Sequence, residues 1–206
     1  INVAVTSADV VMLGRVGETV LSGSSLAGQV QFVLTLFLFG LTSGAAVLTA
    51  QYWGKKDMRT IEKVMGIAFR FSIIVSVIFL LAVQIFPAQV MSIFTPEQPV
   101  IDEGVKYLRI VSFTYLLCAV TQVYLNVMRS VERVVIATVT YSVSLIVNIV
   151  INGILIFGLL GFPRLGIVGA AIGTLIARIV EVLIVVVYAK TKSILNFKLR
   201  DLFVRD

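Results

Sequence analysis

The sequence contains no histidine and only one cysteine among its 206 residues, and just 14% of its residues are charged. It therefore has no Ser/His/Asp set and no cysteine pair, and it has no phosphate-binding glycine loop. Cys118 has no second cysteine with which to form an internal disulfide. These absences argue against a soluble enzyme, and we expect no enzymatic activity and no cofactor. An intramembrane enzyme built on carboxylates alone is an alternative, but Asp9 and Glu181 have no evident catalytic partnership.

Apolar residues, in contrast, are abundant, because 59% of the chain is hydrophobic and the mean hydropathy is +1.04. A chain of this size cannot hide so much apolar surface within itself, so lipid must cover much of it. Since every backbone group in a bilayer has to be paired internally, the long apolar runs are expected to be helices. The sequence thus predicts an all-α integral membrane protein in contact with the lipid bilayer.

Six apolar runs approach the roughly 20 residues that a membrane-spanning helix needs. Connectors rich in glycine, proline, serine and charged residues separate them, among them 22–25 and 87–99. The chain opens inside an apolar stretch without an initiator methionine, so we expect the first helix to be incomplete. The predicted six-helix transmembrane bundle has its helices at about 1–13, 26–50, 64–86, 105–128, 134–158 and 166–189.

Lysine and arginine are distributed unevenly over the connectors. They gather at 54–63, at 129–133 and in the tail at 190–206, whereas the opposite side has Arg15, Lys106 and Arg164. By the positive-inside rule, the loops between helices 2 and 3 and between helices 4 and 5 are cytoplasmic, and so is the tail. We therefore expect a multi-pass protein of the inner (plasma) membrane. This arrangement explains the net charge of +6 without a nucleic-acid partner.

Asp9 is the clearest candidate for a functional group inside the membrane, where ionisable residues are costly. It lies close to the end of the first helix, and hence in the outer half of the bilayer. A carboxylic acid there can load and release a proton, or bind Na⁺ together with neighbouring oxygens. The alternative is a structural carboxylate that an adjacent helix satisfies or that faces the aqueous exit.

A polar stripe on the fifth helix points to the same depth. Tyr141, Ser144, Asn148 and Asn152 fall within an arc of roughly 80° at 100° per residue. Thr174 on the sixth helix also reaches the outer half. Asp9, Asn148, Asn152 and Thr174 can therefore converge from three helices into a site for a small cation. The asparagines, taken singly, are equally explained as hydrogen-bonding contacts between helices.

Two other groups of polar residues are notable. Arg178 and Glu181 lie one turn apart on the sixth helix, and we interpret them as a structural intramembrane ion pair. Gln31 and Thr35 lie on one face of the second helix, which borders either a cavity or a neighbouring helix packed through small residues. The residues that we expect to line a cavity are Gln31, Thr35, Tyr141 and Ser144.

Several motifs resemble the multidrug and toxic compound extrusion (MATE) family. The run 9–17 (DVVMLGRVG) is similar to the end of that family's first helix, where an Asp precedes a Met-x-Gly-x-x-Gly turn. Further similarities follow in the family's order, and together the five motifs cover nearly the whole chain. They are AQYWG at 50–54, YLRI at 107–110, NIVINGILIFG at 148–158 and GIVGAAIGT at 166–174.

The resemblance implies a fold and a function. MATE transporters have twelve helices in two six-helix lobes, and they export organic cations and other drugs in exchange for H⁺ or Na⁺ by alternating access. The chain resembles the N-terminal lobe, with 190–206 as the start of the cytoplasmic linker to a C-terminal lobe. The family's cation site carries over to Asp9, Asn148 and Thr174, which implies H⁺ or possible Na⁺ binding there. Some members have Asp-Pro where this chain has Asn152-Gly153, so the site has one carboxylate and the coupling ion is open.

Three alternatives compete with an efflux transporter. A flippase for lipid-linked precursors belongs to the same superfamily but needs a cationic cavity, and besides Arg178 the only deep cation is Arg70, near a helix end. A non-transporting membrane scaffold would use Asp9 only for packing. A channel would need a charge ring or a filter-like sequence, and neither is present.

Overall fold

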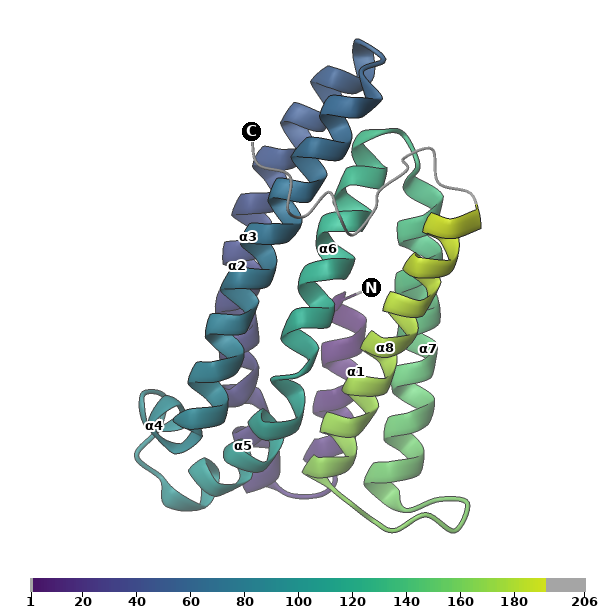
Figure 1. Ribbon diagram of the computed structural model, residues 1–206. Helices are drawn as coiled ribbons and strands as arrows, with labels where there is room; N and C mark the ends of the chain where they lie inside the picture. Colours follow the sequence, from purple (N-terminus) through teal and green to yellow (C-terminus); the bar gives the residue numbers. More distant parts are fainter. Residues whose placement is uncertain (1, 192–206) are drawn as a thin grey trace.

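The computed structural model describes residues 2–191, and this part of the chain folds into helices packed side by side as one bundle (Figure 1). The linker was predicted at 190–206; residues 190 and 191 are helical, and 192–206 lie outside the described residues. The helices are α1 (Asn2–Gly14), α2 (Glu18–Gly54), α3 (Met58–Ile85), α4 (Pro87–Ser92), α5 (Gln98–Val111), α6 (Thr114–Ser130), α7 (Val134–Phe157) and α8 (Ile167–Thr191).

The helices have the length and composition of membrane spans. Four of them, α2, α3, α7 and α8, are long and apolar enough to cross a bilayer, and α5 with α6 forms a fifth candidate bent by 53°. The described part of α1 has 13 residues, fewer than a span needs. All six predicted segments are therefore helical, and the chain is an all-α integral membrane protein.

The predicted start of the second helix was wrong. The serine-rich stretch at 22–25 is not a connector but lies inside α2, which begins at Glu18. The Ser24 hydroxyl donates to the carbonyl oxygen of Leu21 at 3.0 Å, so the helix itself satisfies this hydroxyl. Gly23 is helical because α5 packs directly against it, and a Cβ there would lie 2.9 Å from Glu103 Cβ. Packing between helices overrides the turn preference of these small residues.

The connector expected at 87–99 contains the short helix α4 and the start of α5, and the predicted single helix at 105–128 is broken in two. Proline stands in the first turn of both α4 and α5, where its missing N–H costs nothing. At the break, the Gln84 amide of α3 donates to the carbonyl oxygen of Arg109 at 2.8 Å and to the Ser112 hydroxyl. A side chain of α3 thus compensates for helix hydrogen bonds lost at the bend.

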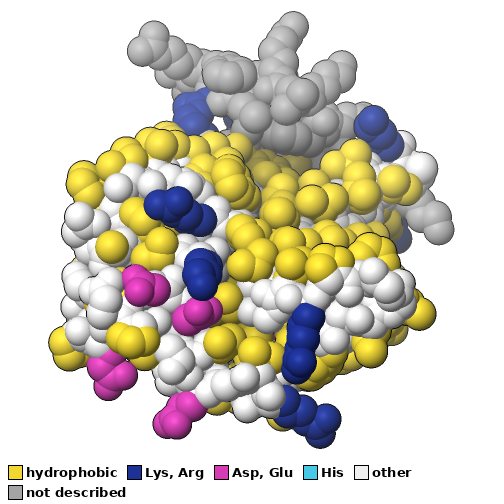
Figure 2. All heavy atoms as spheres, turned by 90° about the horizontal axis from the view of Figure 1, so that it is seen from below, with side chains coloured by type: hydrophobic (Ala, Val, Ile, Leu, Met, Phe, Trp, Pro, Cys, Tyr) yellow, Lys and Arg dark blue, Asp and Glu magenta, His cyan; other side chains and the backbone are white. Residues whose placement is uncertain are grey.

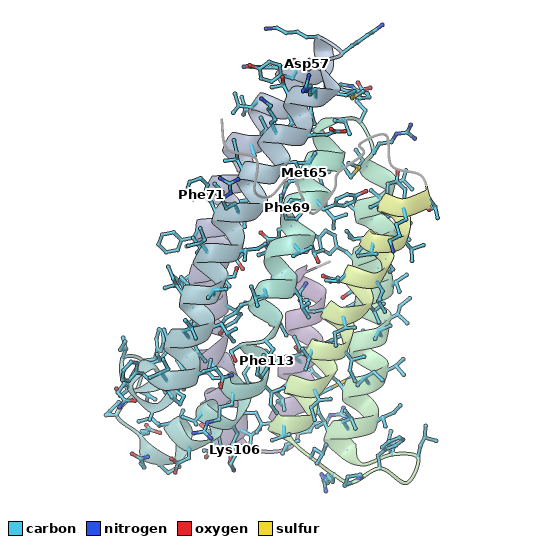
Figure 3. The ribbon with its side chains drawn as sticks, viewed as in Figure 1. Asp57, Met65, Phe69, Phe71, Lys106 and Phe113 are labelled. Atoms are coloured by element: carbon cyan, nitrogen blue, oxygen red, sulfur yellow. The ribbon has the colours of Figure 1, made fainter. Side chains whose placement is uncertain are left out.

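Apolar side chains cover both the inside and the outside of the bundle. Figure 3 shows Met65 and Phe69 of α3 directed toward α6, and Phe71 directed away from the bundle. Met65 is fully buried, whereas Phe71 is 53% exposed. Exposed phenylalanines and isoleucines recur along α2, α3 and α7. Such an outer surface fits a protein surrounded by lipid.

The two ends of the bundle differ in charge. The α2–α3 turn, the α6–α7 turn and the end of α8 lie at one end (Figure 1), which Asp57 marks in Figure 3. The opposite end carries α4 and α5 and is marked by Lys106. Figure 2 looks onto this second end, where acidic and basic side chains are mixed. The connectors that we predicted to share one side of the membrane therefore lie together.

Candidate functional site

The predicted residues of α1 and α7 meet through hydrogen bonds. The Asn152 Nδ2 group donates to Asp9 Oδ1, and it also donates to Asn148 Oδ1 at 3.2 Å. Asn148 and Asn152 are four residues apart, so their side chains stack on one face of α7, the helix against which α1 packs. The Asp9 carboxylate is thereby joined to two amides that are 1% and 0% exposed.

Glycines of α8 make room for these amides. A Cβ on Gly173 would overlap the Asn152 side-chain oxygen. One helical turn earlier, a Cβ on Gly169 would lie 2.8 Å from the backbone of Leu155 on α7. The two helices can therefore approach closely only because these positions lack side chains. The position of Asn152 beside Asp9 depends on this close approach.

Three buried polar atoms near Asp9 have no hydrogen-bond partner within residues 2–191. They are Asn148 Nδ2, Asn152 Oδ1 and Thr174 Oγ1. Buried polar atoms of native proteins are nearly always paired, so unpaired ones clustered at one place indicate capacity for a ligand or water. The cluster includes two oxygens, Asn152 Oδ1 and Thr174 Oγ1, that lie on neighbouring helices and are able to bind a cation.

The same carboxylate opens onto a cavity of about 580 Å³. Asp9 and Thr174 line it from α1 and α8, and Gln31 and Thr35 line it from α2. Farther along, Tyr141, Arg178 and Glu181 belong to its wall. Asn148 and Asn152 are not lining residues and lie behind Asp9. A ligand in the cavity can therefore contact the carboxylate directly. It can affect the two amides only through their hydrogen bonds with Asp9.

One residue that we expected to line the cavity does not. Ser144 is 5% exposed and is absent from the cavity wall, although Gln31, Thr35 and Tyr141 line it as predicted. Ser144 precedes Asn148 and Asn152 by four and eight residues, so it shares their buried face. At 100° per residue Tyr141 falls between Asn148 and Asn152, so the direction of the side chain does not separate it from this face. Tyr141 has the longer side chain, and it lies in the cavity wall together with Arg178 and Glu181.

Arg178 and Glu181 form the expected contact on α8. Arg178 Nη1 lies 3.0 Å from each of the two carboxylate oxygens of Glu181. The Glu181 side chain is 2% exposed, whereas that of Arg178 is 23% exposed. Both residues line the cavity, which the sequence did not indicate.

Sequence reasoning missed three residues of this region. Tyr107 lines the cavity from α5, and its place in the motif at 107–110 was the only available signal. Cys118 lines it from α6 and accepts a hydrogen bond from Gln31 Nε2 at 3.3 Å. Gly173 has no polar side chain, so its role in positioning Asn152 becomes visible only in three dimensions.

The donor set limits which ions fit the site. In the part of the chain that the structure describes, no three His, Cys, Asp or Glu side chains lie close enough to hold a metal ion together. The region around Asp9 instead offers one carboxylate with amide and hydroxyl oxygens. Oxygens of this kind suit a proton or a hard cation rather than a metal ion that prefers thiolate or imidazole ligands.

A bundle of lipid-facing helices with a polar cavity and a partly buried carboxylate in its wall has the architecture of a membrane transport lobe. The MatE family model matches residues 1–154, which is well over half of the chain. The chain therefore belongs to the MatE family. Members of this family are transporters and not enzymes, which confirms both the predicted family and the absence of an enzymatic role.

Individual relatives agree with this assignment. The chain is 28% identical over 162 residues to "Probable multidrug resistance protein YoeA" of Bacillus subtilis, a match that covers 79% of this chain and 35% of that protein. It is 26% identical over 209 residues to "Probable multidrug resistance protein NorM" of Agrobacterium fabrum, covering 99% of this chain and 43% of that protein. The chain thus spans less than half the length of these relatives.

Solved structures share the fold. A MATE crystal structure in the bent conformation superposes with a TM-score of 0.87 at 21% identity, covering 98% of this chain and 44% of that one. An inward-facing multidrug resistance MATE family transporter of the MOP superfamily gives a TM-score of 0.88 at 20% identity, covering 100% of this chain and 46% of that one. The matched part amounts to one of the two lobes of these transporters.

Proposed function

We propose that this chain is the N-terminal lobe of a secondary active multidrug efflux transporter. In this proposal the complete protein exports organic cations or other drugs in exchange for H⁺ or Na⁺, and a C-terminal lobe completes the substrate cavity. Membership of the MatE family supports this function, as do relatives named as multidrug resistance proteins. The observation that carries the coupling step is the hydrogen bond between Asp9 and Asn152 at the cavity wall.

The coupling chemistry follows from the two forms of the Asp9 carboxyl group. An ionised carboxylate accepts hydrogen bonds only, and the Asn152 amide group presently donates to it. A protonated Asp9 becomes a donor, and a bound Na⁺ requires additional oxygens. Either event favours rotation of the Asn152 amide so that its unpaired Oδ1 faces Asp9, with Thr174 Oγ1 as a further oxygen. Loading the cation therefore changes the contact between α1 and α7.

This change gives a route to alternating access. The first helix carries both Asp9 and part of the cavity wall, since Val10 and Leu13 also line the cavity. A cation that alters the packing of α1 against α7 alters the cavity at the same time, and drug affinity falls as the drug is released outward. By thermodynamic reciprocity, a bound drug weakens cation binding by the same factor.

The distribution of charge supports an orientation in the inner (plasma) membrane. We propose that the α2–α3 turn, the α6–α7 turn and the tail face the cytoplasm, because lysine and arginine are concentrated there. Asp9, Asn152 and Thr174 then lie in the outer half of the bilayer. Cations from outside would reach Asp9 without crossing the whole membrane.

A lipid-linked precursor flippase fits the cavity less well. Such a protein must neutralise a pyrophosphate group, which needs several unpaired cations. Among the described residues that line the cavity, Arg178 is the only cation, and Glu181 is paired with it. Asp9 adds a second acid to the wall. The scaffold alternative makes a different prediction, because in a scaffold Asp9 has no role in efflux.

The experiment that tests the proposed function is gradient-driven efflux of a fluorescent organic cation from vesicles that contain the full-length protein. Wild type is compared with Asp9→Asn under separate pH and Na⁺ gradients. Asp102→Asn is the matched control, because Asp102 is exposed at the end of the bundle and bonds only to Gln98 in the described region. We expect Asp9→Asn to abolish efflux and Asp102→Asn to retain it.

The gradient that drives wild-type efflux identifies the coupling ion. Unchanged efflux in a well-expressed Asp9→Asn protein would contradict the coupling role and favour packing alone. Absence of efflux in the wild type under either gradient would contradict the transport function itself.

A further inference from the structure

Arg178 has an unusual position for a residue that only stabilises the fold. Its guanidinium group carries five N–H donors, yet a single nitrogen, Nη1, makes both contacts with Glu181. Nη2 and Nε make no hydrogen bond to other residues in the described region 2–191. The side chain is 23% exposed and lines the cavity. Part of the guanidinium fork is therefore available to a molecule in the cavity.

The free part of the fork suits a carboxylate. Guanidinium and carboxylate groups pair through two parallel hydrogen bonds, which are stronger than neutral ones and fix the geometry. Arg178 follows Thr174 by one turn on the same face of α8, so the cation site and the free donors open onto the same space. A cavity of about 580 Å³ has room for a drug-sized molecule that touches both ends.

The balance of charge in the wall restricts the ligand further. The charged residues that line the cavity in the described region are Asp9, Arg178 and Glu181, two acids and one base. A simple anion is disfavoured by this excess of negative charge. A molecule that carries both a cationic group and a carboxylate satisfies both signs.

We infer that Arg178 forms a carboxylate-binding subsite in the cavity wall, so that this residue sets how strongly the transporter prefers compounds with a carboxylate beside their cationic group. Glu181 is the positioning residue, because it holds Nη1 and thereby orients the rest of the fork toward the cavity. This inference rests on the proposed efflux function. It differs from the structural interpretation of the pair, which gives Arg178 no influence on what is bound.

Energetics favour a role beyond stability. A buried ion pair loses much of its Coulomb attraction to the cost of removing both charges from water, so an apolar pair of equal volume is often as stable. Here the pair is not sealed in the core but has its cationic member open to the cavity. A group that gives little stability and faces a ligand cavity is well placed to select the ligand.

The test uses purified full-length transporter and two dyes of one scaffold. One dye is a xanthene with a cationic amino group and a free carboxylate, and the other is its ethyl ester, which is a plain cation. Fluorescence anisotropy measures the affinity of each dye, so the readout does not depend on transport. The ratio of the two affinities isolates the contribution of the carboxylate.

Three variants accompany the wild type. The double variant Arg178→Gln/Glu181→Gln removes both charges and leaves neither one unpaired. Arg178→Lys retains the charge and the pairing with Glu181 but loses the planar fork. Arg129→Gln is the matched control, since Arg129 is exposed, lies against the Tyr141 ring and does not line the cavity.

We expect the double variant to lose about tenfold in affinity for the carboxylate dye relative to the ester, the size of one charge-assisted hydrogen bond. Arg178→Lys should lose part of this preference, and Arg129→Gln none of it. An unchanged ratio in both Arg178 variants, with the ester still bound, would overturn the subsite and leave the efflux function intact. If wild type binds neither dye, the proposed multidrug function fails together with the subsite.

Discussion

The side chain of Asn152 joins the two helices on which the proposed coupling depends. It donates from α7 to Asp9 on α1 and to Asn148 on its own helix, while its oxygen lies against Gly173 of α8. An amide can turn either its donor or its acceptor toward a carboxyl group, which an aspartate at this position could do only by changing its own protonation. Because Asn152 is uncharged, Asp9 alone supplies the negative charge that balances a bound cation.

Substitution of Gly173 should uncouple this site without touching Asp9. In Gly173→Ala the new Cβ overlaps the Asn152 oxygen, so the amide must move away from the carboxylate. We expect gradient-driven efflux by the full-length protein to fall about tenfold, as for loss of a hydrogen bond to a charged group. Vesicle efflux rates measure this effect.

Gly153→Ala is the matched control, because a Cβ at that helical position meets nothing within 4 Å. It should retain efflux and stabilise α7 by up to about 1 kcal/mol through helix propensity. Equal efflux in the two alanine variants would refute the positioning role of Gly173.

The bend between α5 and α6 depends on a side chain of another helix. Gln84 of α3 bridges the Arg109 carbonyl oxygen and the Ser112 hydroxyl. We expect Gln84→Leu to destabilise the full-length protein by about 1 to 3 kcal/mol, because the Ser112 hydroxyl loses its donor at a helix break and the Arg109 carbonyl oxygen keeps only the Ser112 hydroxyl, at 3.2 Å, as a side-chain donor. Thermal unfolding in detergent measures the change. Gln89→Leu on the exposed face of α4 is the control. If Gln89→Leu lost as much stability as Gln84→Leu, the result would argue against the bridge.

The cap of α3 makes one contribution to stability depend on pH. Asp57 accepts hydrogen bonds from the Thr60 hydroxyl at 2.6 Å and from the Thr60 backbone N–H at 3.1 Å. These bonds lower the pKa of Asp57 below its ordinary value of 3.8. A carboxylate with a depressed pKa stabilises the folded state above the ordinary pKa, and this stabilisation is lost as the pH falls through the lower value.

Wild type should therefore lose more stability than Asp57→Ala when the pH is reduced from 6 to below about 4, the ordinary range of an aspartate. Unfolding temperatures of the full-length protein at several pH values measure the difference. Parallel pH profiles of the two proteins would show that the cap makes no pH-dependent contribution.

At the scale of elements, the sequence predicted the last two helices closely and the earlier ones less well, since α2 and α3 begin eight and six residues before their predicted starts at 26 and 64. The predicted fifth and sixth spans correspond to α7 and α8, which begin and end within two residues of the predicted bounds. An apolar run flanked by glycine and charged residues has clear limits. The early start of α2, the helix α4 and the bend at Ser112 were missed. Each depends on a contact with another helix, which no local pattern encodes.

The candidate site shows the same difference between what local sequence patterns predict and what only the packing of helices reveals. Helical phase and depth predicted that Asp9, Asn148, Asn152 and Thr174 lie near one another, and hydrogen bonds join the first three. Phase could not distinguish the cavity-lining Tyr141 from the buried Ser144, because both lie within one broad polar face. Gly173 was invisible for a further reason, since its contribution is the absence of a side chain.

The whole molecule has two chemically distinct ends, and the orientation proposed for them is testable. With Cys118→Ser as the background, which retains an acceptor for Gln31, a single cysteine is introduced at Lys56 or at Asp102. We expect a membrane-impermeant maleimide added to intact cells to label position 102 and not position 56. Labelling of position 56 alone would invert the proposed orientation.

At the scale of the whole molecule, we propose that a cation bound at Asp9 and a drug bound in the cavity each lower the transporter's affinity for the other. The most direct test is the affinity of purified full-length transporter for a fluorescent organic cation, measured against Na⁺ concentration and against pH in wild type and in Asp9→Asn. We predict that the coupling ion weakens drug binding in the wild type by about 5- to 150-fold, and that Asp9→Asn binds the drug with no such dependence. An equal dependence in the two proteins would contradict the claim and assign the coupling to another site.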